Sequence, residues 1–377
     1  MGRRVLQEAN KMDTPVMKVE RRGERHADRL LPILGSLLLL VGTLLFPALA
    51  LAEAASDWPK GHYPLPERGD LIGEDYTVEA RAEETLLDIA REHNVGYEEI
   101  RRANPDVSVW VPGEGTEVVI PAQRLLPPVP REGIVINVAE LRLYYYPEVE
   151  EGETPRVETY PIGIGREGFS TPLGKTETVM RIENPAWYPP ESVQQEAAAR
   201  GEEAPAVVPP GPDNPLGEHA ILLGFDGYLI HGTNRPDGIG MRASRGCIRM
   251  FPEDIESIFA RVPKGTPVNI INQPIKAGWH AGTPYVQAYE PLEAQENGMA
   301  QLLEALTLLG QSAEGKSMAL DYQQLRGVVD APDGQAVAIR PAPEPEPEPV
   351  VAKTKSDAGG IYEHLGLKQG FLDALEV

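Results

Sequence analysis

Short apolar segments separated by turn residues dominate residues 132–272, and this pattern restricts the fold more than any other feature of the chain. Apolar residues recur at every second position over 134–138 and again over 141–145, which is the period of a β-strand. Helical spacing is found over 252–262, where Pro252 suits a first helical turn. Many short strands with one helix predict a mostly-β barrel or sandwich.

The first 52 residues contain the three parts of a secretory signal. A basic stretch precedes an apolar run over 30–51, and the run ends in a small-x-small sequence. We therefore predict a signal peptide over residues 1–52, cleaved after Ala52. Because the stretch ahead of the basic residues is long, Met12 or Met17 is an alternative start. A retained membrane anchor is the competing interpretation, which the prolines and glycines in the run disfavour.

Composition limits the partners of the chain. The formal net charge is −22, whereas binding to DNA or RNA requires a basic face, so we expect no nucleic-acid partner. The chain has one cysteine, Cys247, and therefore cannot form an internal disulfide. A lone cysteine is usually a small, inert, buried residue, unless the neighbouring sequence points to reactivity. No paired metal-ligand spacing is present, and we expect no metal and no cofactor.

A small compact module is predicted over residues 75–122. A strand at 76–78 precedes a helix that Thr85 is placed to cap, and a second short helix ends before Pro105. A strand at 118–120 closes the module. The order strand, helix, helix, strand would put two helices on one face of a two-stranded sheet.

Several short motifs in this module belong to a known pattern: Tyr76-Thr77-Val78, Thr85-Leu86, Asn94-Val95, Asn104-Pro105, Pro112-Gly113 and Val119-Ile120-Pro121. With them the module resembles a lysin-motif (LysM) domain over its full length. The resemblance implies binding to N-acetylglucosamine-containing glycans such as peptidoglycan. The usual Gly-Asp or Gly-Glu before the Thr-Leu pair is replaced by Glu83-Glu84, which puts the sugar groove in question. A spacer without glycan binding is the alternative.

Four further segments have no chemistry of their own. Pro- and Gly-rich residues predict linkers at 53–74 and 123–131. Residues 273–335 are predicted to be an accessory C-terminal region, with an apolar helix near 299–309. Residues 336–377 form an acidic tail rich in Pro and Glu, for which we predict disorder.

His231 and Cys247 are the candidate catalytic pair. A thiol is mostly protonated at neutral pH, and a neighbouring imidazole can take its proton. His231 follows an apolar strand, and the Gly-rich loop after it can fold back to bring Cys247 close. Gly246 lets the backbone approach the sulfur, so that N–H groups near Gly246 and Cys247 can receive an oxyanion. The spacing alone is also common by chance.

The local pattern is more specific than the spacing. It consists of His231-Gly232-Thr233-Asn234, Gly238-Ile239-Gly240 and Ser244-x-Gly246-Cys247-Ile248-Arg249-Met250, with supporting motifs at 162–165, 171–174, 184–190 and 214–217. Over residues 132–272 these motifs resemble the L,D-transpeptidase catalytic domain. The arrangement behind a LysM module is similar to the periplasmic members of Gram-negative bacteria, which implies export to the periplasm.

The resemblance implies a role for each matching residue. Cys247 would be the nucleophile and His231 the general base, with the carbonyl of Gly232 holding the imidazole tautomer. Ser244 and Gly246 would shape the nucleophile loop.

The resemblance also implies substrate contacts, and each has an alternative. Arg249 would pair with a substrate carboxylate, or it forms a surface salt bridge. Trp187 and Tyr188 would line the substrate path, or they pack in the core. Arg245 departs from the family, many members of which carry histidine there, so local electrostatics and substrate preference are in question.

The implied reaction has two steps. Cys247 attacks the carbonyl of the third stem residue, meso-diaminopimelate, and terminal D-alanine leaves. An amine then resolves the thioester, giving a 3→3 crosslink or the attachment of an outer-membrane lipoprotein, while attack by water would make an L,D-carboxypeptidase. The family is acylated by carbapenems. A non-catalytic LysM wall-binding protein is the alternative function. We also expect the two modules to act independently of each other.

Overall fold

The computed structural model describes residues 58–292, 298–312 and 320–340. The predicted signal peptide, 1–52, and the part of the predicted tail beyond residue 340 lie outside these ranges. The described helices and strands belong to one compact unit, Pro59–Val377. Within the described ranges, no helix has both the length and the apolar character needed to cross a membrane.

The N-terminal module has the predicted order of elements, namely β3 (Tyr76–Glu79), α2 (Leu86–Glu92), α3 (Tyr97–Ala103) and β4 (Glu117–Ile120). β3 pairs antiparallel with β4, and both helices pack their apolar side chains into one cluster with β4. Thr85 caps α2, because its hydroxyl accepts from the Asp88 N–H while the Asp88 carboxylate accepts from the Thr85 N–H. The two helices therefore cover one face of a two-stranded sheet.

Within the described residues, the main sheet has nine strands in the order β1-β8-β7-β6-β15-β10-β11-β12-β14. Their bounds are β1 (His62–Pro64), β6 (Gly133–Asn137), β7 (Arg142–Tyr146), β8 (Arg156–Pro161), β10 (Gly174–Glu183), β11 (His219–Leu223), β12 (Leu229–His231), β14 (Ile248–Arg249) and β15 (Pro267–Ile271). The β6–β15 and β12–β14 pairs are parallel, and the other neighbours are antiparallel. A separate short pair joins β9 (Ile164–Gly165) to β13 (Arg242–Ser244).

The main sheet curls where its longest strand, β10, changes partners. The first part of β10 pairs with β15 and the second part with β11, with an irregular register between Thr178 and Met180. Such an irregularity bends a strand and increases its twist. The two halves of the sheet can then enclose a common interior.

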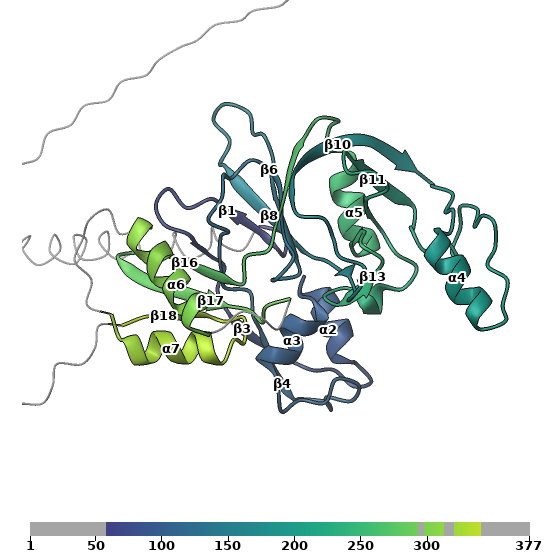
Figure 1. Ribbon diagram of the computed structural model, residues 1–377. Helices are drawn as coiled ribbons and strands as arrows, with labels where there is room; N and C mark the ends of the chain where they lie inside the picture. Colours follow the sequence, from purple (N-terminus) through teal and green to yellow (C-terminus); the bar gives the residue numbers. More distant parts are fainter. Residues whose placement is uncertain (1–57, 293–297, 313–319, 341–377) are drawn as a thin grey trace, which may run out of the picture. The chain divides into compact units, whose positions relative to one another are not determined.

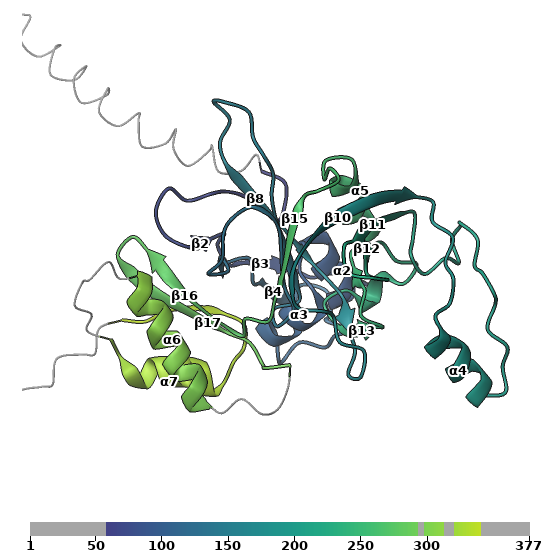
Figure 2. The same ribbon diagram turned by 45° about the horizontal axis from the view of Figure 1, so that its top comes forward.

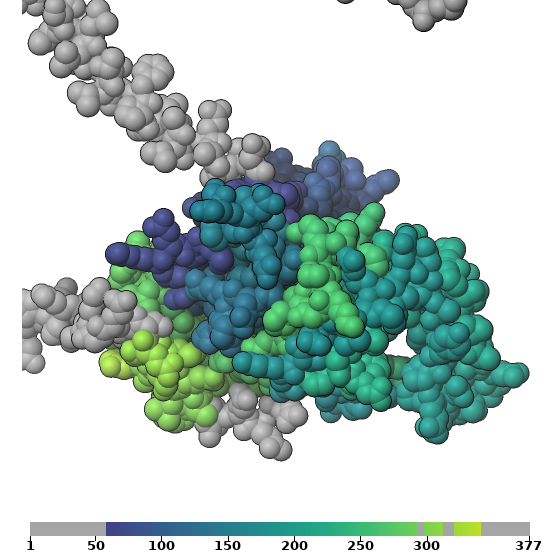
Figure 3. All heavy atoms as spheres, turned by 90° about the horizontal axis from the view of Figure 1, so that it is seen from above, coloured from purple at the N-terminus to yellow at the C-terminus, as the bar shows by residue number. Residues whose placement is uncertain are grey.

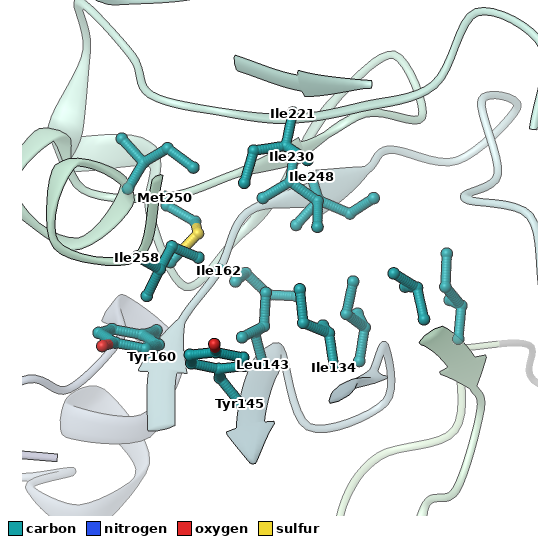
Figure 4. Close-up of a cluster of buried hydrophobic side chains, with 14 of the residues drawn as sticks. Ile134, Leu143, Tyr145, Tyr160, Ile162, Ile221, Ile230, Ile248, Met250 and Ile258 are labelled. Atoms are coloured by element: carbon teal, nitrogen blue, oxygen red, sulfur yellow. The ribbon is translucent and has the colours of Figure 1, made fainter. Parts of the chain in front are cut away.

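One apolar core fills this interior. α5 (Pro252–Phe259) packs Ile255 and Ile258 into it. Figure 4 shows Leu143 of one half of the sheet, and Ile230 and Ile248 of the other, gathered in the same core. The predicted mostly-β domain is confirmed in this curled sheet.

Both predicted linkers, 53–74 and 123–131, contribute strands. β1 forms an edge of the main sheet beside β8, and β2 (Leu71–Ile72) pairs with β5 (Arg124–Leu125). The two residues of β2 and the two of β5 are all buried. Strands of two or three residues are too short to show an alternating apolar pattern. The Pro-rich composition of these segments therefore predicts linkers, although short strands form in them.

The C-terminal region folds as a three-stranded sheet covered by helices. Its elements are β16 (Ile275–His280), β17 (Thr283–Ala288), α6 (Gly298–Ser312), α7 (Tyr322–Asp330) and β18 (Ala336–Ala338). β18 pairs with β17, so the predicted boundary at residue 335 lies a strand too early. In Figure 3 the yellow-green residues of this region pack directly against the blue and teal residues of the main domain.

The acidic segment 191–210 contains the helix α4 (Glu191–Ala199). A bridge between Trp187 and Val208 closes the base of the segment. In Figures 1 and 2, α4 stands away from the sheet, beyond the ends of β10 and β11.

Candidate active site

The parallel pair β12–β14 places the two predicted catalytic residues. Ile230 lies opposite Ile248 in this pair, and both side chains are buried in the core. Successive side chains of a strand point to opposite faces. His231 on β12 and Cys247, directly before β14, therefore belong to the face that points away from the core. Arg249 shares this face, because it lies opposite His231 in the register.

His231 is a buried, neutral imidazole. Its Nδ1 lies 2.6 Å from the carbonyl oxygen of Gly232. A carbonyl can only accept, so Nδ1 carries the proton and Nε2 keeps its lone pair. Burial, followed by the positive charge of Arg249, lowers the pKa of His231 to about 4. The contact predicted for Gly232 is therefore present, and the ring is neutral near pH 7.

A loop around Asn214 supports the backbone beside His231. Asn214 is not among the site residues predicted from the sequence. The Asn214 side chain is fully buried, and its amide donates to the carbonyl of Pro185 at 2.8 Å. Gly217 has φ of +68°, and a Cβ there would lie 2.9 Å from the Thr233 nitrogen. The loop thus packs against the backbone directly after His231. The Asn-Pro-Leu-Gly motif at 214–217 was the available signal.

Ser244 and Thr171 shape the nucleophile loop. The Ser244 hydroxyl donates to the carbonyl of Cys247 at 2.6 Å and accepts from the Gly246 N–H at 3.1 Å. The Thr171 hydroxyl donates to the carbonyl of Gly246 at 2.8 Å. Gly246 has φ of +107°, and a Cβ there would lie 2.8 Å from the Tyr228 ring. The loop therefore requires glycine at this position.

The same contacts correct one expectation about the oxyanion. The Gly246 N–H is already bonded to Ser244, so it is not free to receive a developing oxyanion. Of the two predicted backbone donors, the Cys247 N–H stays a candidate.

Cys247 is a protonated thiol in this state. Its Sγ lies 3.8 Å from the carbonyl oxygen of Gly227, and within the described part of the chain no hydrogen bond joins it to His231. Burial raises the pKa of the thiol, and the Leu229 N–H and the charge of Arg249 offset this effect only in part. At rest the two residues are thus a neutral thiol and a neutral imidazole on the same face of the strands.

Arg249 lies on this face without a carboxylate partner among the described residues. Its backbone exchanges two hydrogen bonds with Gly163, at 2.8 and 2.9 Å, which fixes the strand. Its guanidinium forms no ion pair with any carboxylate among the described residues, and its Nε is buried without a hydrogen-bond partner. The salt-bridge alternative is therefore not supported. An unpaired, half-buried guanidinium is suited to binding a carboxylate bidentately.

The α4 segment is tied to the nucleophile loop through Arg245. The guanidinium of Arg245 pairs with Glu196 of α4 and donates to the Ser192 hydroxyl at 3.1 Å. Arg166 pairs with the same Glu196 at 2.6 Å. Tyr188, next to this helix, is 72% exposed, so core packing does not explain it, whereas Trp187 is half-buried at the base of the segment.

The comparisons with known proteins agree with one another. Residues 131–270 match the family model YkuD, the L,D-transpeptidase catalytic domain. The chain is similar to the probable L,D-transpeptidase YcfS of Escherichia coli, at 43% identity over 78% of this chain and 91% of that protein. It is also similar to the probable L,D-transpeptidase YbiS of E. coli, at 41% identity over 73% of this chain and 90% of that protein. The chain belongs to the L,D-transpeptidase family.

A solved structure, the catalytic domain from an E. faecium L,D-transpeptidase, is 20% identical over 38% of this chain and 100% of that chain, with a TM-score of 0.29. Membership in the L,D-transpeptidase family confirms the predicted enzyme class and the peptidoglycan-directed activity. The residues that match the family model do not include the N-terminal module, so its glycan binding stays a prediction.

Proposed function

We propose that this L,D-transpeptidase works through a thioester on Cys247, with His231 as the general base. The observation that carries the proposal is the parallel pairing of β12 and β14, which puts His231 and Cys247, the residue directly before β14, on one face, with the imidazole neutral and bonded to Gly232. Hydrogen bonds between catalytic groups are often long before the substrate binds and shorten in the complex.

The first step forms the acyl-enzyme. As Sγ bonds to the carbonyl carbon of the third stem residue, the thiol proton passes to Nε2 of His231. The C–N bond to terminal D-alanine then breaks, and the imidazolium returns the proton to the leaving amine. Because both groups are neutral at rest, this step is general-base catalysis rather than attack by a preformed thiolate.

The second step releases the acyl group. An amine attacks the thioester carbonyl and loses a proton to His231, the C–S bond breaks, and the cysteine sulfur regains its proton. The amine of a second diaminopimelate gives a 3→3 crosslink, and a lysine of an outer-membrane lipoprotein gives wall attachment. Water gives the L,D-carboxypeptidase product. We propose the first two as the acceptors of this enzyme.

Arg249 is proposed to bind a carboxylate of the stem peptide. It has no carboxylate partner among the described residues, and it shares a face with His231 and Cys247. Charge-assisted, bidentate pairs of this kind fix orientation as well as adding affinity. Trp187 and the exposed Tyr188 are proposed to contact the peptide near the base of the α4 segment.

Acylation by a carbapenem tests the proposal. Intact-protein mass spectrometry of the full chain should show one adduct, and Cys247→Ala should show none. A wild-type protein without an adduct would leave the non-catalytic wall-binding protein as the better account. Adding an acceptor amine to tetrapeptide substrate then separates the products, because hydrolysis alone gives tripeptides without crosslinked dimers.

We also propose that the N-terminal module binds glycan. The loop between α3 and β4 exposes Trp110 (67%) and Val111 (73%) to solvent, and an exposed indole is a suitable platform for a sugar ring. Glu84, part of the departure from the LysM pattern, is paired with Arg81 at 2.6 Å, which neutralises its charge. Trp110→Ala should weaken binding to isolated sacculi, while Tyr322→Ala, at an exposed residue of α7, should not.

Export to the periplasm is proposed from the predicted signal peptide. The mass of the mature protein from a periplasmic extract tests it, because cleavage after Ala52 leaves a chain that begins at Glu53. A full-length mass in the membrane fraction would instead indicate a retained anchor.

A further inference from the structure

The N-terminal module contacts the chain on both sides of the nucleophile segment, which we define as residues 241–250. Before the segment, the Tyr97 N–H donates to the carbonyl of Ile239 at 3.1 Å, and the next N–H of α3 donates to the carbonyl of Gly240 at 3.3 Å. After the segment, Arg91 of α2 binds Glu253 of α5 through two hydrogen bonds of 2.7 and 2.8 Å. Cys247 therefore lies between two contacts that the module provides.

The first contact is a close backbone approach between two glycines. A Cβ on Gly96 would lie 2.8 Å from the Cα of Gly240, and a Cβ on Gly240 would lie 2.2 Å from the Tyr97 nitrogen. Neither distance is compatible with a side chain unless the backbones separate. The fit of α3 against the catalytic domain thus depends on the absence of side chains at both positions.

Buried charges hold the module in this place. Glu99 of α3 pairs with Arg142 of β7 at 2.6 Å and with Arg124 at 2.9 Å, and the Arg142 side chain is fully buried. Burial alone would raise the pKa of Glu99, but the two guanidiniums hold it at about 2. Arg142 also donates to the carbonyl of Asn94 at 3.0 Å. Breaking these pairs would deprive the Arg142 guanidinium of its carboxylate partner, and the loss of one partner of a buried pair is costly.

Hydrogen bonds connect the glycine contact to the nucleophile. The Gly240 N–H donates to the carbonyl of Ile162 at 3.2 Å, and the Ile164 N–H donates to the carbonyl of Met241 at 3.1 Å. β13 follows at once and ends at Ser244, whose hydroxyl binds the carbonyl of Cys247. A displacement at Gly240 would therefore reach the cysteine through a short stretch that these hydrogen bonds hold in place.

We propose that the N-terminal module positions the nucleophile segment for acylation, with Gly96 and Arg91 as positioning residues. This inference rests on the proposed role of Cys247. It also replaces the independence of the two modules that the sequence suggests, because a module that is anchored by buried ion pairs and contacts the chain before and after the nucleophile segment is part of the catalytic domain's structure.

Gly96→Ala in the full chain is the main test. Gly96 has φ of −86°, which any residue adopts, so the new methyl group acts through its contacts, of which the approach to Gly240 at 2.8 Å is the tightest. We expect the rate constant of carbapenem acylation to fall about tenfold. Gly327→Ala is the matched control, because a Cβ there has no neighbour within 4 Å, and it should be acylated at the wild-type rate.

A charge swap tests the second contact. Arg91 and Glu253 are both partly exposed, so reversing either charge should leave the fold intact. Arg91→Glu and Glu253→Arg should each slow acylation about threefold or more, because like charges then face each other. The double variant, Arg91→Glu with Glu253→Arg, should recover a rate within about twofold of wild type. Recovery in the double variant would show that the pairing of the two charges, and not either residue alone, sets the rate.

The form of the kinetic change separates positioning from unfolding. A displaced segment lowers the rate constant while all the protein is finally labelled, whereas unfolded protein lowers the final extent of labelling. Wild-type rate constants in Gly96→Ala and in both single charge reversals would overturn the inference. A wild-type protein that forms no adduct would instead refute the proposed role of Cys247, so the two failures are distinguishable.

Discussion

His231 lies directly opposite Arg249 in the parallel register of β12 and β14. The guanidinium adds its charge to the effect of burial, and together they lower the pKa of the imidazole to about 4. The arrangement keeps the base unprotonated at any pH near neutrality. It also places the Arg249 guanidinium next to the base in the register. No described carboxylate forms an ion pair with this guanidinium.

The pH dependence of acylation follows from this pair. A histidine with the ordinary pKa of about 6.5 would be only about one-tenth neutral at pH 5.5. With a pKa of about 4, His231 is almost entirely neutral at that pH, and protonation removes the base only as the pH falls through 4. We expect the carbapenem acylation rate at pH 5.5 to stay within about twofold of the rate at pH 7. A tenfold loss at pH 5.5 would contradict this account.

Arg249→Met should have two separable effects. Loss of the carboxylate partner should lower kcat/KM for tetrapeptide donors about 10- to 100-fold, mainly through KM. Loss of the charge should raise the pKa of His231, which NMR titration of the imidazole measures. Arg249→Lys retains the charge but not the bidentate geometry, so it should restore the pKa of His231 more fully than the KM. Wild-type KM in Arg249→Met would exclude a substrate contact.

Gly246→Ala should destabilise the protein and slow acylation. The residue has φ of +107°, and its Cβ would meet the Tyr228 ring at 2.8 Å. Backbone strain and this contact should together lower the free energy of unfolding by about 1–3 kcal/mol, measured in urea. Gly168→Ala is the control, because φ is +80° there and no atom lies within 4 Å. Equal losses in both variants would show that the Tyr228 contact contributes nothing.

The fold was predictable where strands are long and regular. The alternating residues of β6 and β7 point their apolar side chains into the core, as the pattern over 134–145 indicates. The two-residue strands β2 and β5 show no period, and their pairing joins segments that the sequence separates by a whole module. The same limit hides β1 at the sheet edge.

The sequence says more about which residues form the candidate site than about their protonation states. The motif indicates the contact of His231 with Gly232, which is present, whereas the protonation of His231 and Cys247 depends on burial and on the charge of Arg249. The bond between Ser244 and the Gly246 N–H, which removes one oxyanion donor, depends on loop geometry that no spacing encodes. The ion pair of Glu99 with Arg142 likewise joins two modules that are separate in the sequence, so no local pattern indicates it.

A buried ion pair joins the C-terminal region to the main domain and gives a further prediction. Lys276 of β16 lies 2.7 Å from Glu140, and both side chains are fully buried. Lys276→Met should lower the free energy of unfolding by about 3–5 kcal/mol, because Glu140 is left as an unpaired buried charge. Adding Glu140→Leu should recover much of this loss in the double variant. A Lys276→Met protein as stable as wild type would show that the two parts are joined by other contacts.

The most direct test of the central claim is the acylation rate constant of His231→Ala, measured by intact-protein mass spectrometry with the full chain. If the imidazole takes the thiol proton, acylation should slow by about 10²–10⁴-fold, while the variant still unfolds cooperatively. Acylation of His231→Ala at the wild-type rate would contradict the account, because Cys247 would then be ionised by some other group.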